Sequence, residues 1–491
     1  MRVAASHPKN MVLETPNKEA APKEMPGNVT VTLSNGVRID CGELPAQVIN
    51  RLSRLAAFRN PEFGRKLRMH LSVRDTPRFI DRSRFENDEL VLPRACVNEA
   101  LSVVRAAGAM PLVVDARSVG RRIHARFTGV LRASQVPCRE KLVEHELGVL
   151  VAPMGFGKTV VAASIIATHQ VSTLIIVPNT TLLDQWRKSL STYLDIDDEP
   201  PVLYTPTGRK RKQQPGVVGI MGGGKKLRSG IVDIALPGSL MEKGEVAGDT
   251  VVSSFVGEYG MVIVDEAHHM AAQKFLEVFG AVRARYVYAM TATPKRSDGL
   301  DRILFLECGP LRHEATIAEQ IDEQGMRHLL VTRFSMSKPN LEKRTNWHAL
   351  MDYISEDEER NHLVATDAVR ALRLGRTPLV LTRRVEHARV LAKLIEGSAS
   401  SLEARVMLLV GADPDVIRRK NLEDLRLVPA QCPLCVVATG NYVGEGFDLD
   451  RLDTLLLAGP VADDTPLTQW VGRLHRVRSG KQEVIVMDYI D

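Results

Sequence analysis

Residues 148–159 read Gly-Val-Leu-Val-Ala-Pro-Met-Gly-Phe-Gly-Lys-Thr, and this stretch decides the fold. An apolar run enters a loop with two glycines, and residues 160–166 continue it with an apolar helical pattern. We interpret the three parts as a buried strand, a tight loop and the start of a helix. Backbone N–H groups in such a loop point inward, and the helix N-terminus adds positive potential, so the loop suits phosphate.

The side chains that close this loop are those of a P-loop. Lys158 can reach the β- and γ-phosphates of a nucleotide, and the Thr159 hydroxyl can ligate Mg²⁺. Ala152 stands where the usual pattern begins with glycine, which leaves a chance glycine-rich turn as the alternative. The predicted nucleotide-binding residues of the loop are Ala152, Pro153, Met154, Gly155, Phe156, Gly157, Lys158 and Thr159.

Apolar strand patterns alternate with helical patterns on both sides of this loop and predict an α/β fold with parallel sheets. A first series includes 173–178, 232–236, 261–264 and 286–290, and a second begins at 378–382. Two α/β domains in tandem leave a cleft between them. We predict a disordered tail over 1–28, a small α+β module over 29–122, and α/β domains over 123–310 and 311–491.

The α+β module is expected to open with a β-hairpin, because 29–33 and 37–41 alternate around Ser34-Asn35-Gly36. A helix is expected over 45–58. Cations outnumber the acids Glu62, Asp75 and Asp81 between residues 51 and 84, which favours phosphate contacts over a merely solvated face. The cations are Arg51, Arg54, Arg59, Arg65, Lys66, Arg68, Arg74, Arg78, Arg82 and Arg84.

Asp265 and Glu266 directly follow the apolar strand 261–264, roughly a hundred residues after the P-loop. A carboxylate at such a strand end can hold Mg²⁺, and a second can polarise the attacking water. We therefore predict that Asp265 holds the metal and that Glu266 is the catalytic base.

Charge that develops on the γ-phosphate requires a cation from elsewhere in the fold. Arg473 and Arg476 are three residues apart and share one helix face, with Gln469 one turn ahead. Thr291 and Thr293 follow another apolar strand, where their hydroxyls could relay between the acids and the second domain.

Gln135 lies about 20 residues before the P-loop. Its two-sided amide could bind the adenine edge, or it could be an exposed helical glutamine.

Composition limits the protein class. The chain has 491 residues, 44% of them hydrophobic and 25% charged, and a formal net charge of +6. These values are typical of a soluble globular protein, and a positive balance fits a polyanion partner. Six scattered cysteines and the lack of a signal-peptide pattern or membrane-length apolar run predict a reducing, cytoplasmic location. We interpret the pair Cys432 and Cys435 as small apolar residues at a strand, since zinc needs four ligands.

The order of these motifs resembles that of superfamily 2 helicases and translocases over 125–491. Residues 152–159 resemble motif I, 177–186 motif Ia, 265–268 the DEAH form of motif II, and 291–293 motif III. Residues 438–440 with 444–448 resemble motif V, and 469–476 motif VI. The pattern is most similar to the branch that includes XPB-like proteins, UvsW-like proteins and type III restriction subunits.

The resemblance implies two RecA-like lobes with ATP and Mg²⁺ between them, and nucleic acid across both. It implies nucleotide contacts from Gly446 and Asp448 of motif V, and a coupling role for His268. The expected activity is that of an ATP-hydrolysing DNA helicase or translocase, moving 3′ to 5′ in repair, restriction or defence. Alternatives are an RNA helicase or remodeller and a nucleotide-gated DNA-binding subunit. Expected partners are duplex or single-stranded DNA and a nuclease or other subunit in trans.

Overall fold

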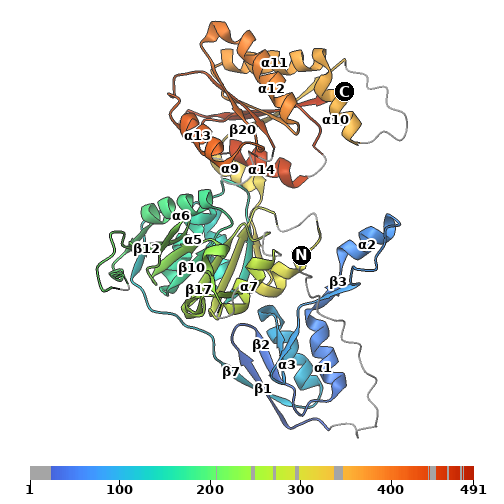
Figure 1. Cartoon of the computed structure of the whole chain (residues 1–491), viewed down its shortest axis with the longest axis vertical. Coiled ribbons are helices and arrows are strands. Elements are labelled where there is room, and N and C mark those ends of the chain that lie inside the picture. The colour runs from blue at the N-terminus through green and yellow to red at the C-terminus, as the bar shows by residue number, and fades with distance from the viewer. Residues whose placement is uncertain are drawn as a thin grey trace, which may run out of the picture.

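The computed structural model describes residues 24–205, 207–244, 249–268, 272–293, 298–336, 347–440, 442, 449–461, 464–475, 478 and 480–490. Its three largest sheets form an N-terminal module, a first lobe and a second lobe, which Figure 1 shows in succession, and three two-stranded sheets accompany them in the described residues. The two larger sheets are largely parallel and their strands alternate with helices along the chain, so the predicted α/β fold class is confirmed. Within the described part of the chain, no helix has the length and apolar character that crossing a bilayer requires.

The N-terminal module has a five-stranded sheet in the order β5-β6-β2-β1-β7, with β1 and β7 parallel. The predicted hairpin is confirmed, because Val31 pairs with Ile39 and Leu33 with Val37. Its elements are β1 (Asn28–Leu33), β2 (Val37–Asp40), α1 (Ala46–Ser53), η1 (Arg54–Ala56), β3 (Ala57–Arg59), α2 (Pro61–Arg68), β4 (Phe79–Asp81), β5 (Arg84–Glu86), β6 (Glu89–Leu92), η2 (Arg94–Cys96), α3 (Val97–Ala106) and β7 (Met110–Asp115).

The helix predicted over 45–58 is too long. Helix α1 ends at Ser53, a 3₁₀ turn follows, and Phe58 pairs with Ile80 as part of β3. The apolar residues of this stretch fit both patterns, because Val48, Leu52, Ala56 and Phe58 all face one core. Pairing with a strand some twenty residues away decides between helix and strand, and local periodicity does not contain that information.

Lobe 1 is built on an eight-stranded sheet in the order β13-β12-β14-β10-β17-β18-β9-β19. Only the edge strand β13 is antiparallel to its neighbour. The elements are β8 (Ala125–Phe127), α4 (Gln135–Val143), β9 (Leu147–Val151), α5 (Lys158–His169), β10 (Thr173–Ile176), α6 (Thr180–Tyr193), β11 (Leu194–Ile196), β12 (Val218–Gly222), β13 (Lys225–Leu227), β14 (Val232–Ala235), η3 (Pro237–Leu240), β15 (Met241–Lys243), β16 (Thr250–Val252), η4 (Ser254–Glu258), β17 (Met261–Asp265), α7 (Gln273–Ala281), β18 (Tyr286–Thr291), α8 (Asp301–Cys308) and β19 (Leu311–Glu314).

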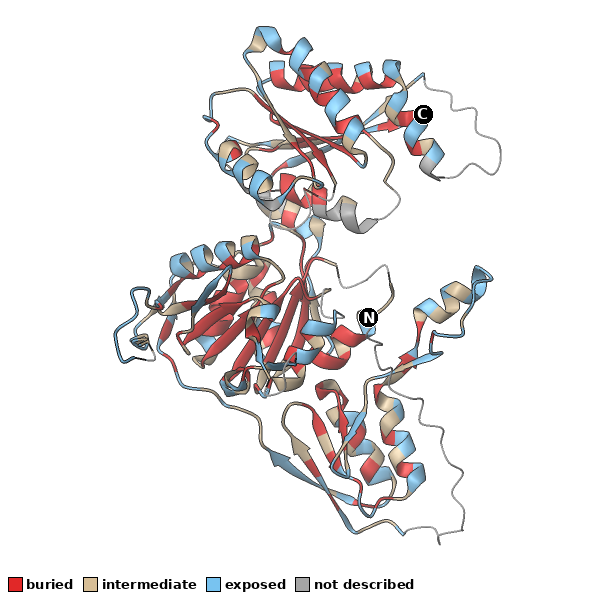
Figure 2. Cartoon of the chain, in the orientation of Figure 1, coloured by how far each residue is buried: buried red, intermediate tan, exposed pale blue. Residues whose placement is uncertain are grey.

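Both faces of the lobe 1 sheet are covered, which explains why its strands read as continuous apolar runs. Helices α4, α5 and α6 bury one face and α7 and α8 the other, and Figure 2 shows the buried strands between them. Strand β19 pairs with β9 up to Glu314. The predicted boundary between residues 310 and 311 therefore falls four residues before this sheet ends.

Lobe 2 has a six-stranded, fully parallel sheet in the order β20-β25-β24-β21-β23-β22. Helices α11 and α12 cover one face, and α13 and α14 contribute to the core on the other. Its elements are α9 (Ile317–Gln324), β20 (Arg327–Phe334), α10 (Trp347–Glu356), α11 (Glu358–Arg373), β21 (Pro378–Thr382), α12 (Val385–Ser398), η6 (Ser400–Leu402), β22 (Arg405–Leu409), α13 (Asp415–Arg426), β23 (Leu434–Thr439), β24 (Thr454–Leu457), α14 (Asp464–Leu474) and β25 (Glu483–Ile490).

Candidate nucleotide site between two lobes

The P-loop joins β9 to α5, as the sequence predicts. Gly155 and Gly157 have φ angles of 76° and 91°, a region that L side chains avoid and glycine adopts freely. Ala152 lies before this turn, fully buried, and donates its N–H to Thr291 of β18. The strained positions of the loop are thus the two glycines, which explains why alanine is accommodated at position 152.

Gln135 at the start of α4 contacts the backbone of the P-loop. Its amide nitrogen donates to the Phe156 carbonyl at 2.7 Å, and its amide oxygen accepts from Arg132 N–H at 2.9 Å. The Arg132 guanidinium donates to the same Phe156 carbonyl. Both ends of the Gln135 amide therefore bind the protein, and its predicted contact with adenine stays a prediction. Only 2% of Gln135 is exposed.

The predicted acidic pair lies at the carboxyl end of β17, between β10 and β18. Asp265 and Glu266 are 3% and 4% exposed. Lys158 of the P-loop approaches Glu266, with 3.5 Å between Nζ and Oε1, and is 3.4 Å from the Ala152 carbonyl. Because β17, β18 and β9 are parallel neighbours, their carboxyl ends bring P-loop and acids together.

Trp186 is a member of the site that sequence reasoning missed. Its indole Nε1 donates to Asp265 Oδ2 at 2.6 Å, and its side chain is fully buried in α6. Glu266 N–H donates to the other Asp265 oxygen at 2.9 Å. A buried indole N–H requires an acceptor. The sequence feature that could have indicated this contact is therefore a tryptophan on the core face of a helix, near the strand that ends in the acids.

The electrostatics of the pair suit a cation. Burial and the neighbouring Glu266 raise the pKa of Asp265 above the ordinary carboxyl range, and Lys158 opposes this shift. Oε2 of Glu266 is buried without a hydrogen bond from any described residue. Glu266 also has a φ of 48°, an uncommon backbone state for a non-glycine residue that clusters at functional sites. Buried carboxylate oxygens are donors that Mg²⁺ prefers, so Asp265 and Glu266 fit a magnesium ion.

The predicted coupling residues adjoin the acids. His268 Nδ1 lies 3.5 Å from Glu266 Oε2 and 3.2 Å from Thr291 Oγ1. Thr291 Oγ1 in turn donates to the Thr293 carbonyl and accepts from Thr293 N–H. One polar chain therefore runs from the acidic pair to the segment after β18.

Lobe 2 forms the opposite wall of the site. A side-chain carbon on Gly472 of α14 would lie 2.8 Å from the Met154 side chain, so the two lobes touch at the P-loop. Arg473 follows Gly472 and is 4% exposed. A cavity of about 650 Å³ adjoins this contact, lined by Gln135, Gly155 and Gly157 from lobe 1 and by Arg426 and Asp450 from lobe 2.

Helix α9 bridges the lobes and was not expected at the site. Its Gln320 amide donates to the Met154 carbonyl at 3.4 Å, and Glu323 accepts from the Ser134 hydroxyl at 2.6 Å. Thr316 and Glu319 form a capping box at the start of this helix. The remaining predicted residues Arg476, Gly446 and Asp448, and the side chain of Gln469, lie outside the described residues.

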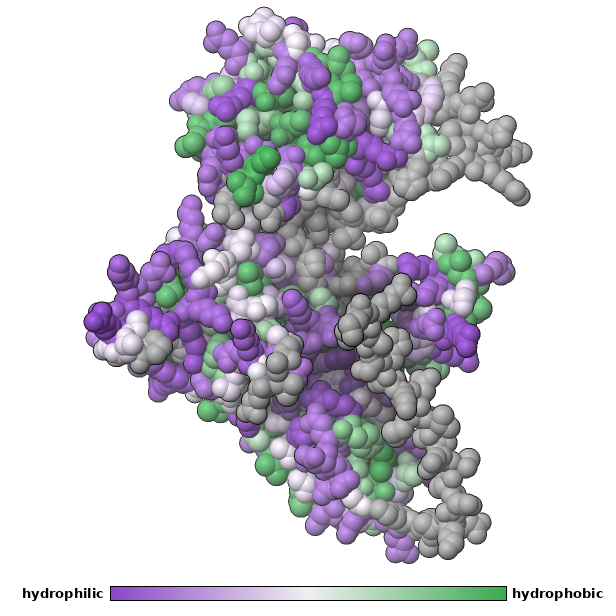
Figure 3. Space-filling model, viewed as in Figure 1, coloured by the Kyte–Doolittle hydropathy of each residue, from purple (hydrophilic) through white to green (hydrophobic). Residues whose placement is uncertain are grey.

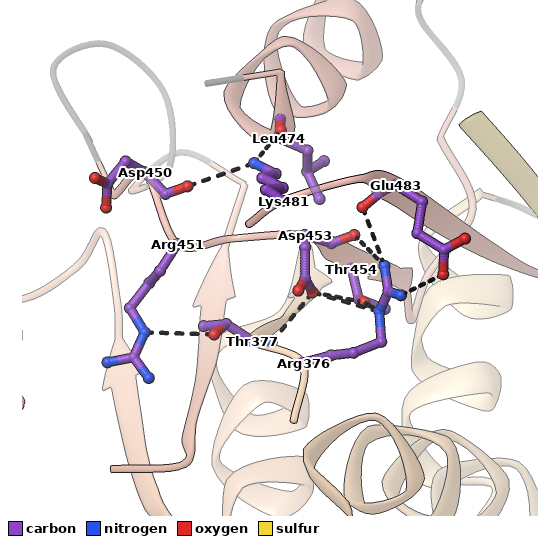
Figure 4. Close-up of polar contacts among 9 residues, drawn as sticks. All are labelled: Arg376, Thr377, Asp450, Arg451, Asp453, Thr454, Leu474, Lys481 and Glu483. Atoms are coloured by element: carbon purple, nitrogen blue, oxygen red, sulfur yellow. Dashed lines mark hydrogen bonds and ion pairs between the residues drawn. The ribbon is translucent and has the colours of Figure 1, made fainter. Parts of the chain in front are cut away.

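A second polar cluster lies at the amino edge of the lobe 2 sheet, where β21, β24 and β25 begin (Figure 4). Arg376 donates to Thr454 Oγ1 at 2.6 Å and to Glu483 Oε1 at 2.7 Å, and its Nη2 donates to the Asp453 and Glu483 carbonyls. Lys481 donates to the Leu474 carbonyl at the end of α14. Lys481 therefore contacts the end of the helix that carries Arg473.

Comparisons with known proteins find similarity to a restriction-enzyme subunit, a helicase and a DNA translocase. Residues 122–296 match the family model described as type III restriction enzyme, res subunit. A protein described as helicase 161L, of Invertebrate iridescent virus 6, is 27% identical over 420 residues, which cover 82% of this chain and 86% of that protein. The DNA 3′-5′ translocase XPB2 of Sulfurisphaera tokodaii is 27% identical over 44% of this chain and 42% of its own length.

A solved structure agrees with the observed architecture. The fragment of an HsdR subunit of a type I restriction enzyme from Vibrio vulnificus superposes with a TM-score of 0.51. The two are 17% identical, and the match covers 74% of this chain and 65% of that one. At this identity the likeness establishes the fold.

Proposed function

We propose that this chain moves on DNA in the 3′-to-5′ direction. The premise is that it is a superfamily 2 helicase or translocase, which hydrolyses ATP to act on nucleic acid. The observation that supports the ATP-driven part of the proposal is the assembly of Lys158, Asp265 and Glu266 at one sheet edge, with α14 of lobe 2 against the P-loop. The similarity to a relative named as a DNA 3′-5′ translocase supports the substrate and the direction.

In this proposal the nucleotide phosphates bind the loop 152–159, with Lys158 leaving Glu266 for the phosphate oxygens. Thr159 and Asp265 hold the magnesium ion, which when bound offsets the negative charge of the phosphates. Trp186 and the Glu266 N–H keep the Asp265 carboxylate oriented. Glu266 orients and deprotonates the attacking water, a role suited to a buried carboxylate oxygen that accepts no hydrogen bond from a described residue.

Lobe 2 completes the site with Arg473, whose always-charged guanidinium stabilises charge on the transferred phosphoryl group. Arg476, Gln469, Gly446 and Asp448 are proposed to act beside it. His268, Thr291 and Thr293 connect Glu266 to the strand end and are proposed to couple hydrolysis to the grip on nucleic acid. The basic N-terminal module is proposed to add phosphate contacts on the same substrate.

The test is steady-state ATPase activity of the full chain with duplex DNA, single-stranded DNA and RNA, for the wild type and for Lys158→Ala. We expect stimulation by DNA, and a loss of at least a hundredfold in Lys158→Ala because a charged phosphate contact is removed. Translocation on DNA with a single-stranded extension at one end, 3′ or 5′, reads the direction.

Other outcomes decide between the alternatives. Stimulation by RNA alone would favour an RNA helicase or remodeller, a description that a relative from Acanthamoeba polyphaga mimivirus carries. Unchanged turnover in Lys158→Ala would contradict the assignment of the site. Full activity in cells for a Glu266→Gln variant would favour a nucleotide-gated binding subunit that does not need hydrolysis.

A further inference from the structure

An arm of residues 57–81 extends from the N-terminal module (Figure 1). Strands β3 and β4 form its stem, with Ala57 paired to Asp81 and Arg59 to Phe79. Helix α2 lies beyond the stem, and none of its residues is buried. The outer part of the arm therefore contributes no residue to the hydrophobic core of the module.

The conformation of the arm is nevertheless closely specified. Asn60 is buried, caps α2 through the Glu62 N–H, and donates to the Pro77 carbonyl. Lys66 donates to Thr76 at 2.7 Å and so ties the helix to the returning chain. Helix α2 ends in a Schellman motif, because Leu71 N–H binds the Lys66 carbonyl and His70 has a φ of 53°. An exposed element built this way is positioned for an external ligand.

Positive charge concentrates on the arm. It carries six cations against the three acids Glu62, Asp75 and Asp81. The excess of three is half of the formal net charge of +6 of the whole chain. The cations are Arg59, Arg65, Lys66, Arg68, Arg74 and Arg78.

The end of the arm is apolar. Leu67, Met69 and Leu71, which we call the apolar tip, are 59%, 61% and 53% exposed. In a Schellman motif the residue after the left-handed one commonly packs on an apolar residue of the last helical turn. Here that position is Lys66, so Leu71 stays in solvent. Figure 3 shows hydrophobic residues gathered at the end of the arm beside hydrophilic ones.

The arm is anchored on lobe 1 next to the segment that follows Thr293. A side-chain carbon on Gly299 would lie 2.8 Å from the Pro61 ring, so the two segments are in contact. Glu307 of α8 pairs with Arg82, just after the arm, at 3.6 Å and with the buried Arg94 at 3.2 Å. Arg94 also donates to the Phe279 and Val282 carbonyls at the end of α7. The stem is therefore attached to the helices that follow the acidic pair and Thr293.

We propose that the arm binds nucleic acid at a junction between duplex and single strand, with its arginines on the phosphates and its apolar tip against the terminal base pair. Cations fit the phosphate backbone, and exposed leucine and methionine side chains are the type that wedge between or stack on bases. This inference rests on the proposed function and adds to it the structure of the DNA that is recognised.

The test compares the affinity of the full chain for a forked DNA duplex, a blunt duplex of the same sequence and a single strand. The tip variant is Leu67→Ser/Met69→Ser/Leu71→Ser, and these exposed side chains can change without disturbing the core. We expect the wild type to prefer the fork, and the tip variant to lose about tenfold on the fork and less than twofold on the blunt duplex. Leu374→Ser/Leu427→Ser, two exposed leucines of lobe 2, is the matched control and should change neither.

A second variant, Arg65→Ala/Arg68→Ala/Arg74→Ala, tests the phosphate contacts. It should weaken binding to all three DNAs and reduce the dependence of affinity on salt. An unchanged salt dependence would overturn this part of the inference.

Three results would overturn the role of the tip: a wild type that does not prefer the fork, a tip variant with unchanged fork affinity, and a tip variant that loses equally on all three DNAs. If sedimentation shows instead that the tip variant alters self-association and leaves fork affinity intact, the tip binds a second copy of the chain. ATPase stimulation by DNA, duplex or single-stranded, separates this inference from the proposed function. If the wild type shows no such stimulation, the proposed function is wrong. If the stimulation is present but the tip variant keeps its fork affinity, only the proposed binding at a junction is wrong.

Discussion

The acidic pair of lobe 1 and the Arg376 cluster of lobe 2 are both polar groups shielded at the edge of a parallel sheet. In lobe 1, two carboxylates lie side by side with one lysine, and one carboxylate oxygen has no hydrogen bond from a described residue. In lobe 2, all three guanidinium nitrogens of Arg376 donate hydrogen bonds, and Asp453 accepts from Thr377 N–H and the Thr454 hydroxyl.

This difference in hydrogen bonding indicates which cluster stabilises the fold and which is suited to bind a ligand. Burying charge costs several kcal/mol per ion unless partners compensate it, and a fully bonded network recovers that cost. The Arg376 cluster has these hydrogen bonds in place, so we assign it to holding the sheet edge where β21, β24 and β25 begin. In the lobe 1 pair one carboxylate oxygen has no hydrogen bond from a described residue, which is consistent with the proposed binding of a cation and a nucleotide there.

Removing Arg376 should have the largest effect on stability. Arg376→Met removes the arginine that pairs with Asp453 and Glu483 in a largely buried site, so we expect the free energy of unfolding to fall by about 3–5 kcal/mol. Chemical denaturation of the full chain measures this change. Arg389→Met, which removes an exposed pair with Glu386, should cost under about 1 kcal/mol. Equal losses in the two variants would contradict the structural role of the cluster.

Trp186→Phe should have a smaller effect, visible in the pH dependence of ATPase activity. Burial and Glu266 raise the pKa of Asp265 to about 6, and the indole hydrogen bond opposes that shift. Activity should therefore be lost as the pH falls through this pKa, because the protonated carboxyl cannot hold the metal. Without the indole donor the pKa rises further, so the acid limb should move to higher pH, with activity at neutral pH about tenfold lower.

The control for this prediction is Tyr259→Phe. It removes a hydroxyl that donates at 2.7 Å to Asp233, a fully buried carboxylate of β14 in the same sheet. Both variants lose one donor to a buried carboxylate, so both should lose a similar amount of stability. Only Trp186→Phe should move the acid limb of the activity profile. An identical shift in the control would assign the pH effect to general destabilisation.

The sequence predicted the lobe 1 half of the site because its groups belong to short local patterns. A P-loop, an Asp-Glu pair and a Thr-x-Thr each follow an apolar strand, and parallel strands bring their carboxyl ends together. Trp186 lies in the stretch that resembles motif Ia, but its role was missed because its contact with Asp265 spans 79 residues. Gln320 was missed because its contact with Met154 spans 166 residues and belongs to no motif. The contact of Gln135 with the Phe156 carbonyl was not predicted, because only the folded loop presents that carbonyl to its amide, and the predicted contact with adenine stays a prediction.

The N-terminal module was predicted less fully, for a different physical reason. Its hairpin follows from local turn chemistry at Asn35-Gly36, which the structure contains. Its arm depends on the pairing of β3 with β4 across the intervening helix, and on Arg94 docking against α7 and α8 some 190 to 210 residues later. The basic composition of 51–84 indicated a partner, but it could not indicate that the cations share an arm with an apolar tip.

The most direct test of the central claim is the thermal unfolding of Glu266→Gln beside its ATPase activity. The pKa of Asp265 is raised in the folded state, so the folded protein binds more protons than the unfolded one below that pKa. Stability should accordingly fall as the pH rises from about 4 to 6. At neutral pH, removing one of the two buried charges should raise the melting temperature by about 2–4 °C, if roughly 1 kcal/mol is recovered. We expect that increase together with a loss of at least a hundredfold in hydrolysis and a retained stabilisation by Mg²⁺-nucleotide. A variant that melts at a lower temperature than the wild type and still hydrolyses ATP at a comparable rate would contradict this expectation.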